Sequence, residues 1–163
     1  MYATREDIEE ICIAPTIEDV LKIVFRVMER MPGRILWIAG PLTSGSRSPE
    51  ENRKRLLRTI THYKERGMTT LNYLPFQRRA MEIVQYEIRS KKPKGIDPQE
   101  RLRGEFYEPI FKSGKIGELR IMAGSEASLN VMWMRGYASA TAQNPPKQRI
   151  KVHFIPRELV PKE

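Results

Sequence analysis

A short apolar run between two glycines constrains the fold of this chain more than any other feature. Residues 34–39 read RILWIA, and a continuous apolar run of this length is typical of a strand that is buried on both faces. The polar loop 40–47 follows it. A capping box at Ser48 then predicts a helix, and the run at 68–74 predicts the next strand. Strand, loop, helix and strand in this order indicate a parallel α/β unit.

The same alternation continues to the end of the chain. Residues 76–114 are mostly helical and basic, with Asp97 and Pro98 restarting a helix and Pro109 expected to kink or end it. The later pattern predicts a strand at 116–122, a polar loop at 124–128, a helix at 129–141 and a strand at 149–155. We therefore expect an α/β fold with a flavodoxin-like or Rossmann-like parallel sheet of about four to five strands, flanked by helices.

Two extra helices are expected before this alternation. Thr4 and Thr16 are predicted N-caps, and apolar residues from 17 to 31 form a broad stripe at helical spacing. We expect this stripe to pack on a partner subunit and so to make a homo-oligomer. The expected organisation is a helical extension at 1–33, an α/β domain at 34–156 and a tail at 157–163.

The composition argues against several kinds of protein. One cysteine, Cys12, excludes an internal disulfide and a cysteine-built zinc site, and two histidines argue against a histidine metal centre. We expect neither a metal nor another cofactor. No apolar run approaches the ~20 residues of a membrane span, and no signal peptide follows Met1. The expectation is a cytoplasmic protein without a membrane partner.

The net charge of +9 is concentrated in one segment. Residues 47–103 hold 15 Lys and Arg against 7 Asp and Glu, which indicates attraction of phosphates, from nucleotides up to nucleic acid. A solvated helical surface explains the same charges. The side chains that favour a nucleic-acid partner are Phe76, Tyr86, Arg89, Lys91, Lys92 and Lys94. The segment carries no helix-turn-helix, zinc or RNA-recognition motif.

Two loops carry side chains suited to an anionic ligand. Each follows a predicted strand and precedes a helix, and open α/β sheets bind ligands at the carboxyl ends of their strands. Small residues expose backbone N–H groups, and a helix N-terminus favours an anion. The ligand-binding residues that we expect are Gly40, Thr43, Ser44, Gly45, Arg47, Arg53, Ser125, Ser128 and Asn130.

Both loops also have plain structural interpretations. The first contains neither a Walker A motif nor G-x-G-x-x-G and can be a simple turn. In the second, Ser125 or Ser128 can cap the helix while Glu126 complements the helix dipole.

Two motifs resemble the nucleoside 2-deoxyribosyltransferase-like family. Residues 35–41 (ILWIAGP) resemble the family's opening IYIAGP. Residues 122–130 (MAGSEASLN), with Tyr137 and Ala138, resemble its LPGWExSxG…ExxYA segment. The resemblance covers about Arg34 to Ile155. Within the family, the chain most resembles a small branch found in bacteria and phages.

The resemblance implies a sheet that binds nucleosides or nucleoside monophosphates and cleaves or exchanges the N-glycosidic bond. In the family, a glutamate of the second motif is the nucleophile, a tyrosine of the first strand orients it, and an aspartate of the third strand helps to hold the sugar or base. Hydrolase members hold the 5′-phosphate with the first loop and the motif serine, here Ser128. Dimers or higher oligomers are also implied.

This chain departs from the family at those positions. The nucleophile position is Met134, whose thioether offers no anionic oxygen. The tyrosine position is Trp37, which we expect to stack on a base or sugar, and the aspartate position is Gly117. The motif glycine is Asn130. No carboxylate lies between residues 127 and 142, so a shift in alignment does not restore the nucleophile.

Three hypotheses follow. The first is a nucleotide-binding protein, specifically for nucleoside monophosphates, that lacks glycosidase chemistry. The second is an active deoxyribosyltransferase or deoxynucleotide N-glycoside hydrolase that uses a displaced carboxylate, namely Glu126, Glu118 or Glu105. The third is a protein that binds nucleic acid or another anionic partner through residues 47–103.

Overall fold

The chain folds into two units, each described here by itself. The computed structural model describes residues 2–45, 47–91 and 95–160. A helical unit comprises Met1–Met31 and Tyr73–Ser113, and an α/β unit comprises Pro32–Asn72 and Gly114–Glu163. The middle helices thus group with the N-terminal ones, which differs from a separate extension at 1–33 followed by one continuous domain at 34–156.

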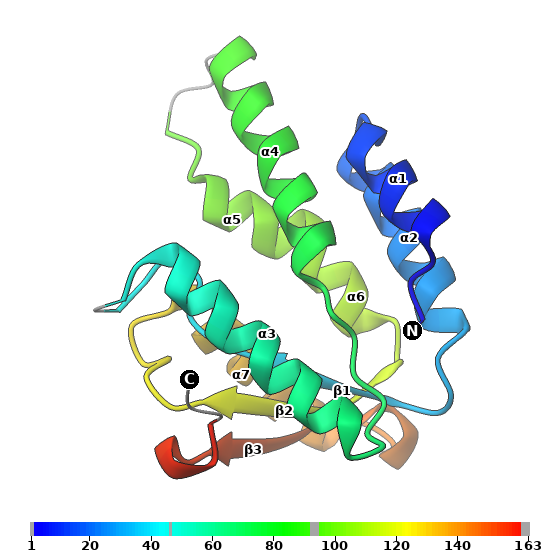
Figure 1. Cartoon of the computed structure of the whole chain (residues 1–163), viewed down its shortest axis with the longest axis vertical. Coiled ribbons are helices and arrows are strands. Elements are labelled where there is room, and N and C mark those ends of the chain that lie inside the picture. Colours follow the sequence, from blue (N-terminus) through cyan, green and yellow to red (C-terminus); the bar gives the residue numbers. More distant parts are fainter. Residues whose placement is uncertain (1, 46, 92–94, 161–163) are drawn as a thin grey trace. The chain divides into compact units, whose positions relative to one another are not determined.

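The α/β unit is built on a parallel sheet flanked by helices (Figure 1). Within the described residues it has three strands in the order β1 (Ile35–Ala39), β2 (Ile116–Met122) and β3 (Lys151–Ile155). Helix α3 (Pro49–Glu65) follows β1, and α7 (Leu129–Ala140) connects β2 to β3. All five residues of β1 are buried, as the apolar run predicts. Short 3-10 turns lie at Thr141–Gln143, Pro146–Gln148 and Arg157–Leu159.

Helices α3 and α7 cover opposite faces of this sheet (Figure 1). The guanidinium of Arg120 in β2 lies 4.7 Å from the ring centroid of Tyr63 in α3. The next residue, Ile121, faces a pocket that α7 also lines. Successive side chains of a strand point to opposite faces, so β2 is covered on both sides.

The strand predicted at 68–74 does not form, so a sheet of four to five strands is not confirmed. Only Thr70 makes a parallel bridge, to Leu36, and the Leu36 N–H donates to the Thr69 carbonyl at 2.8 Å. The chain runs beside β1 for this short stretch and then begins helix α4 at Leu74. Within the segment, Thr70 and Leu71 are buried, being 2% and 3% exposed, but the segment does not complete a ladder.

One arginine binds the amino ends of the sheet together. Arg34 donates hydrogen bonds to the carbonyls of Ile116 at 2.7 Å, Arg149 at 2.8 Å and Gly114 at 3.3 Å. A Cβ at Gly117 would lie 2.8 Å from the Cβ of Arg34. Glycine is therefore needed at 117 to let the Arg34 side chain cross β2.

The helical unit starts its helices at predicted caps. Its elements are α1 (Arg5–Ile13), α2 (Ile17–Glu29), α4 (Leu74–Lys91), α5 (Pro98–Leu102), the π-helical turn Arg103–Tyr107 and α6 (Glu108–Lys112). Thr4, Thr16 and Asp97 accept the capping hydrogen bonds, as predicted. Pro109 does not end the helix. The wider π turn precedes it, with the Glu108 N–H donating to the Arg103 carbonyl, and the helix then continues into α6.

The apolar stripe of α2 is buried inside this unit. Val20, Val24 and Val27 are 0% exposed, and α2 packs on α1, on α4 and on the π-helical turn. Phe76 and Val84 of α4 are equally buried. Because the chain itself covers the stripe, the stripe no longer gives a reason to expect a homo-oligomer.

A buried carboxylate joins α1 to α2. The side chain of Asp7 is 1% exposed and accepts hydrogen bonds from Arg30 Nη1 at 2.5 Å, Arg26 Nη2 at 2.8 Å and the Thr4 N–H at 2.7 Å. Burial alone would raise the pKa of this carboxyl, but the hydrogen bonds from Arg30, Thr4 and Arg26 hold it well below its ordinary value. The ionised form is therefore favoured in the folded state.

We predict that Asp7→Asn lowers the free energy of unfolding by about 1–3 kcal/mol, because two arginines lose their shared partner. Since the pKa of Asp7 is depressed on folding, its contribution is complete above pH ~4 and is lost as the pH falls further. Urea unfolding followed by circular dichroism, repeated across this pH range, measures both effects. Asp19→Asn, in an exposed capping contact of α2, is the control. Equal losses for both variants would contradict the assignment.

Candidate functional site

Two loops begin side by side at the carboxyl edge of the sheet. The first loop (residues 40–47) follows β1, and the second loop (residues 123–128) follows β2. The two strands are neighbours and parallel, with Ala39 paired to Ile121. Parallel strands end at the same edge, so the register places the starts of both loops together. This is the edge where open α/β sheets bind ligands.

The first loop is held by a side chain that the sequence analysis did not single out. Asn52 of α3 is 3% exposed, and its Nδ2 donates to the carbonyls of Ser44 at 3.1 Å and Leu42 at 3.4 Å. Gly45 has φ +92°, a conformation that other residues rarely adopt. At Gly40, an added Cβ would lie 2.8 Å from the Met122 sulfur, so glycine permits close contact between the ends of β1 and β2.

A second unforeseen residue, Arg55, joins the first helix to the second loop. Arg55 lies on α3, is half-buried, and donates from Nη1 to the Ala123 carbonyl at 3.3 Å. Arg53, which we expected to bind the ligand, is half-buried on the same helix. Residues two apart point to different sides of a helix, so Arg55 rather than Arg53 reaches the second loop.

Arg55 belongs to a group of four arginines, called the arginine cluster. Its members are Arg47 of the first loop, Arg55 and Arg58 of α3, and Arg157 just after β3. Burial lowers the pKa of Arg55 first, and the positive charges of Arg47, Arg157 and Arg58 lower it further. The described charges that shift this pKa are therefore all cations, and they come from the first loop, from α3 and from the segment just after β3.

The serines of the second loop have local partners. Ser125 Oγ donates to the Met122 carbonyl at 2.6 Å, and Ser128 Oγ accepts from the Val131 N–H at 3.3 Å as the N-cap of α7. They are 4% and 8% exposed. The capping interpretation therefore holds for Ser128. Glu126, between them, is exposed, and Asn130 is half-buried.

The remaining expected site residues lie in the first loop and in β1. Thr43, Gly45 and Arg47 are exposed, and Ser44 is half-buried. Trp37 is 1% exposed within β1 and so offers no accessible face for stacking on a base. Gly117 lies near the amino end of β2, under Arg34.

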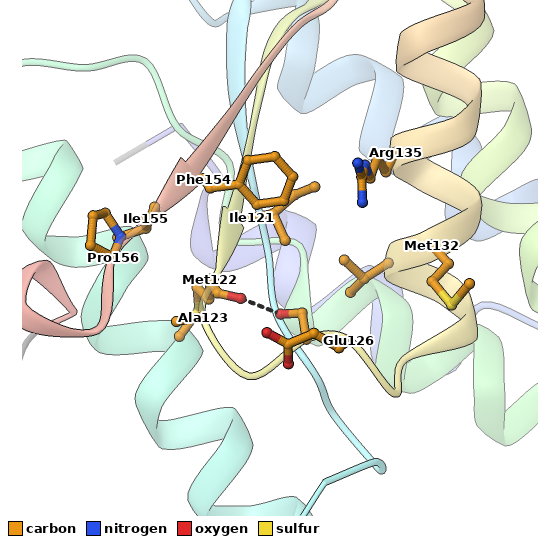
Figure 2. A pocket seen from close by; sticks show the side chains of 11 residues that line it. Ile121, Met122, Ala123, Glu126, Met132, Arg135, Phe154, Ile155 and Pro156 are labelled. Atoms are coloured by element: carbon orange, nitrogen blue, oxygen red, sulfur yellow. Dashed lines mark hydrogen bonds between the residues drawn. The ribbon is translucent and has the colours of Figure 1, made fainter.

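A pocket with a volume of about 300 Å³ opens between α7 and the ends of β2 and β3 (Figure 2). Its apolar walls include Ile121, Val131, Met132 and Phe154, and its charged groups are Glu126 and Arg135. Of the described residues of the first loop, none lines this pocket. Among the described residues, no cluster of three or more His, Cys, Asp or Glu could hold a metal ion.

The carboxylates considered for catalysis occupy different surroundings. Met134, at the position that the motif resemblance aligns with the nucleophile, is 2% exposed in the core of the α/β unit. Glu118 pairs with Arg120 at 2.6 Å, and Glu105, in the helical unit, pairs with Arg101 at 2.6 Å. Glu126 is the only carboxylate among the described residues that line the pocket.

The basic segment 47–103 is divided between the two units. Within the helical unit, several of its cations have acidic partners: Arg78 and Arg79 with Glu82, and Arg101 with Glu87. Phe76 is 0% exposed, whereas Tyr86 is 68% exposed. Lys92 and Lys94 lie outside the described residues.

No protein-family model matches the chain, and neither a curated protein nor a solved structure matches it. None of the helices in the described part of the chain is both long enough and apolar enough to cross a membrane. The geometry of the carboxyl edge therefore carries the functional argument.

We predict that Asn52→Ala loosens the first loop, because two carbonyls lose their donor. Amide exchange at residues 42–45 should accelerate about tenfold, which corresponds to the loss of one to two hydrogen bonds. Thr61→Ala, at an exposed position of the same helix, should leave this exchange unchanged. Unchanged exchange in Asn52→Ala would show that the loop is held by other contacts.

Proposed function

We propose that the α/β unit binds a nucleoside monophosphate at its carboxyl edge, without cleaving the N-glycosidic bond. The observation that carries the proposal is the arginine cluster, in which Arg55 reaches from α3 to the second loop. The positive charges of Arg47, Arg157 and Arg58 all act unfavourably on the charged form of Arg55, and an anionic ligand would offset that repulsion. Guanidinium groups bind phosphate oxygens in a bidentate manner, which suits a phosphate monoester.

The arginines, rather than a helix N-terminus, supply the attraction for the anion. At the start of α3, the Glu51 carboxylate accepts from the Ser48 N–H at 2.9 Å and from the Ser48 hydroxyl at 3.1 Å. The hydrogen bonds from Ser48 lower the pKa of Glu51, so this position already holds a negative charge. At the start of α7, Ser128 makes the cap. Arg47 and Arg157 are exposed and accessible to a ligand.

Binding without glycosidase chemistry is supported by the positions of the carboxylates. Retaining glycoside chemistry uses two carboxyl groups about 5 Å apart, and Glu126 is the only one among the described pocket-lining residues. Glu118 and Glu105 are each held by an arginine. The buried thioether of Met134 cannot form a glycosyl ester. The nucleoside part of the ligand is proposed from the motif resemblance in residues 35–41 and 122–138.

We predict that Arg55→Gln weakens the binding of deoxyribonucleoside monophosphates by about 10- to 100-fold, because a charge-assisted hydrogen bond is lost. Isothermal titration calorimetry measures the affinity. Arg66→Gln removes the same charge at the exposed far end of α3 and should bind as the unmodified chain does. If both variants bind nucleotides equally weakly, the attraction comes from net charge alone. If the chain binds no nucleotide but binds DNA or RNA in a salt-sensitive way, the nucleic-acid hypothesis is favoured.

We also predict that nucleotides bind without turnover. Deoxyribonucleoside monophosphates should raise the melting temperature by mass action, while chromatography of the same mixtures should show base release no faster than in buffer. If the chain releases base and Glu126→Gln abolishes that release, binding without cleavage is refuted and the protein is an enzyme that uses a displaced carboxylate.

A further inference from the structure

The pocket beside α7 adjoins the arginine cluster. Ala123 lines the pocket, and its carbonyl accepts the hydrogen bond from Arg55. Pro156 also lines the pocket, and the next residue is Arg157 of the cluster. The Ala123 N–H donates to the Ile155 carbonyl at 3.2 Å, which holds these two edges of the pocket together. One ligand can therefore contact both the cluster and the pocket around the ends of β2 and β3.

The pocket presents an aromatic ring to solvent. Phe154 is 59% exposed on β3, and Met132 on α7 is 56% exposed. The guanidinium of Arg135, which also lines the pocket, lies over the Phe154 ring, 5.1 Å from its centroid (Figure 2). An exposed phenyl ring beside a thioether and aliphatic walls is a surface for stacking a planar ring.

Glu126 supplies hydrogen-bond acceptors to this pocket. Figure 2 shows its carboxylate near Met122 and Ala123, away from Arg135. An ionised carboxylate only accepts hydrogen bonds, and its two oxygens fit two parallel N–H donors. Among the common bases, guanine carries two adjacent N–H donors, at N1 and N2, on its Watson–Crick edge. Adenine offers one amino group there, and hypoxanthine offers N1–H alone.

We infer that this pocket binds the base of the nucleotide and prefers guanine, with the ring stacked on Phe154 and the N1–H and N2–H groups donating to Glu126. The inference rests on the proposed function, since the arginine cluster holds the phosphate of the same ligand. It adds a substrate class, because the cluster alone does not distinguish one base from another.

The test compares five ligands by calorimetry on the full chain: GMP, IMP, AMP, ribose 5-phosphate and guanosine. We expect GMP to bind about tenfold more tightly than IMP or AMP, since one charge-assisted hydrogen bond separates them. Ribose 5-phosphate should bind more weakly than any nucleotide. Glu126→Gln should remove the preference for GMP and leave the affinity for ribose 5-phosphate unchanged. Glu65→Gln, at an exposed position outside the pocket, should keep the preference.

Phe154 is tested with two variants, because its ring also contacts Arg135. Phe154→Leu keeps an apolar side chain, and Phe154→Ala removes it. Both variants should lower the affinity for all three nucleotides toward the affinity for ribose 5-phosphate. Neither variant should change the affinity for ribose 5-phosphate itself. Leu159→Ala, at another exposed apolar residue outside the pocket, is the matched control.

The outcomes separate this inference from the function on which it rests. If no phosphate-bearing ligand binds, the proposed function fails. If the nucleotides and ribose 5-phosphate bind equally well and depend on Arg55, the proposed function stands and the base pocket is overturned. A homodimer that dissociates in Phe154→Ala, with no discrimination among the ligands, would also overturn it, because the exposed ring would then be a subunit contact.

Discussion

The parallel pairing of β1 with β2 is the constraint on which the candidate site depends. These strands are distant in the sequence, because α3, the bridge at Thr70 and the middle helices of the helical unit separate them. The pairing brings the first and second loops to one edge. At the opposite edge, Arg34 holds the carbonyls of the segments that enter β2 and β3, and Gly117 leaves room for its side chain. The amino edge of the sheet is thus held by the hydrogen bonds of Arg34, and the carboxyl edge carries the two loops.

Positive charge is concentrated near the carboxyl edge of the sheet, around Arg55. Arg55 is half-buried and close enough to three other guanidinium groups for its pKa to fall. Arginine keeps its charge at any physiological pH, so the repulsion is relieved by a bound anion rather than by loss of a proton. The helical unit contrasts with this arrangement, because its buried Asp7 is matched by Arg26 and Arg30. Charges of opposite sign meet at Asp7, whereas the charges that shift the pKa of Arg55 are all positive.

Local signals in the sequence predicted much of the fold. The caps at Thr4, Thr16, Ser48, Asp97 and Ser128 are all present, because each depends on a side chain and the amide two or three residues later. The strand β1 was predicted for a similar reason, since a short apolar run needs burial on both faces. The segment at 68–74 is less apolar, with Thr69, Thr70 and Asn72 among its residues, and whether it forms a strand depends on where the chain goes next.

The candidate site was less predictable than the elements that build it. Loop residues were expected to bind the ligand, yet Asn52 and Arg55, on the helix that follows, organise the loops. Choosing Arg55 over Arg53 requires knowing which side of α3 faces the second loop. The exposure of Phe154 was equally hidden, because an alternating strand does not reveal which face its neighbours cover. Such facts arise from long-range packing, and composition and spacing do not encode them.

The burial of Met134 distinguishes the proposed nucleotide-binding protein from a glycosidase that would carry a glutamate at this position. A glutamate at this position would place a carboxylate among core side chains, since Met134 is 2% exposed and α7 packs on β2 and β3. Burial would raise its pKa and favour the neutral acid, which is a poor nucleophile. Trp37, at the position of the orienting tyrosine, is buried in β1 and so cannot reach a ligand at the edge. The two positions that the motif resemblance would assign to glycosidase chemistry thus lie in the core, while Arg47 and Arg157 are exposed. The proposed recognition of an anionic nucleotide therefore rests on the arginines and does not need a carboxylate at position 134.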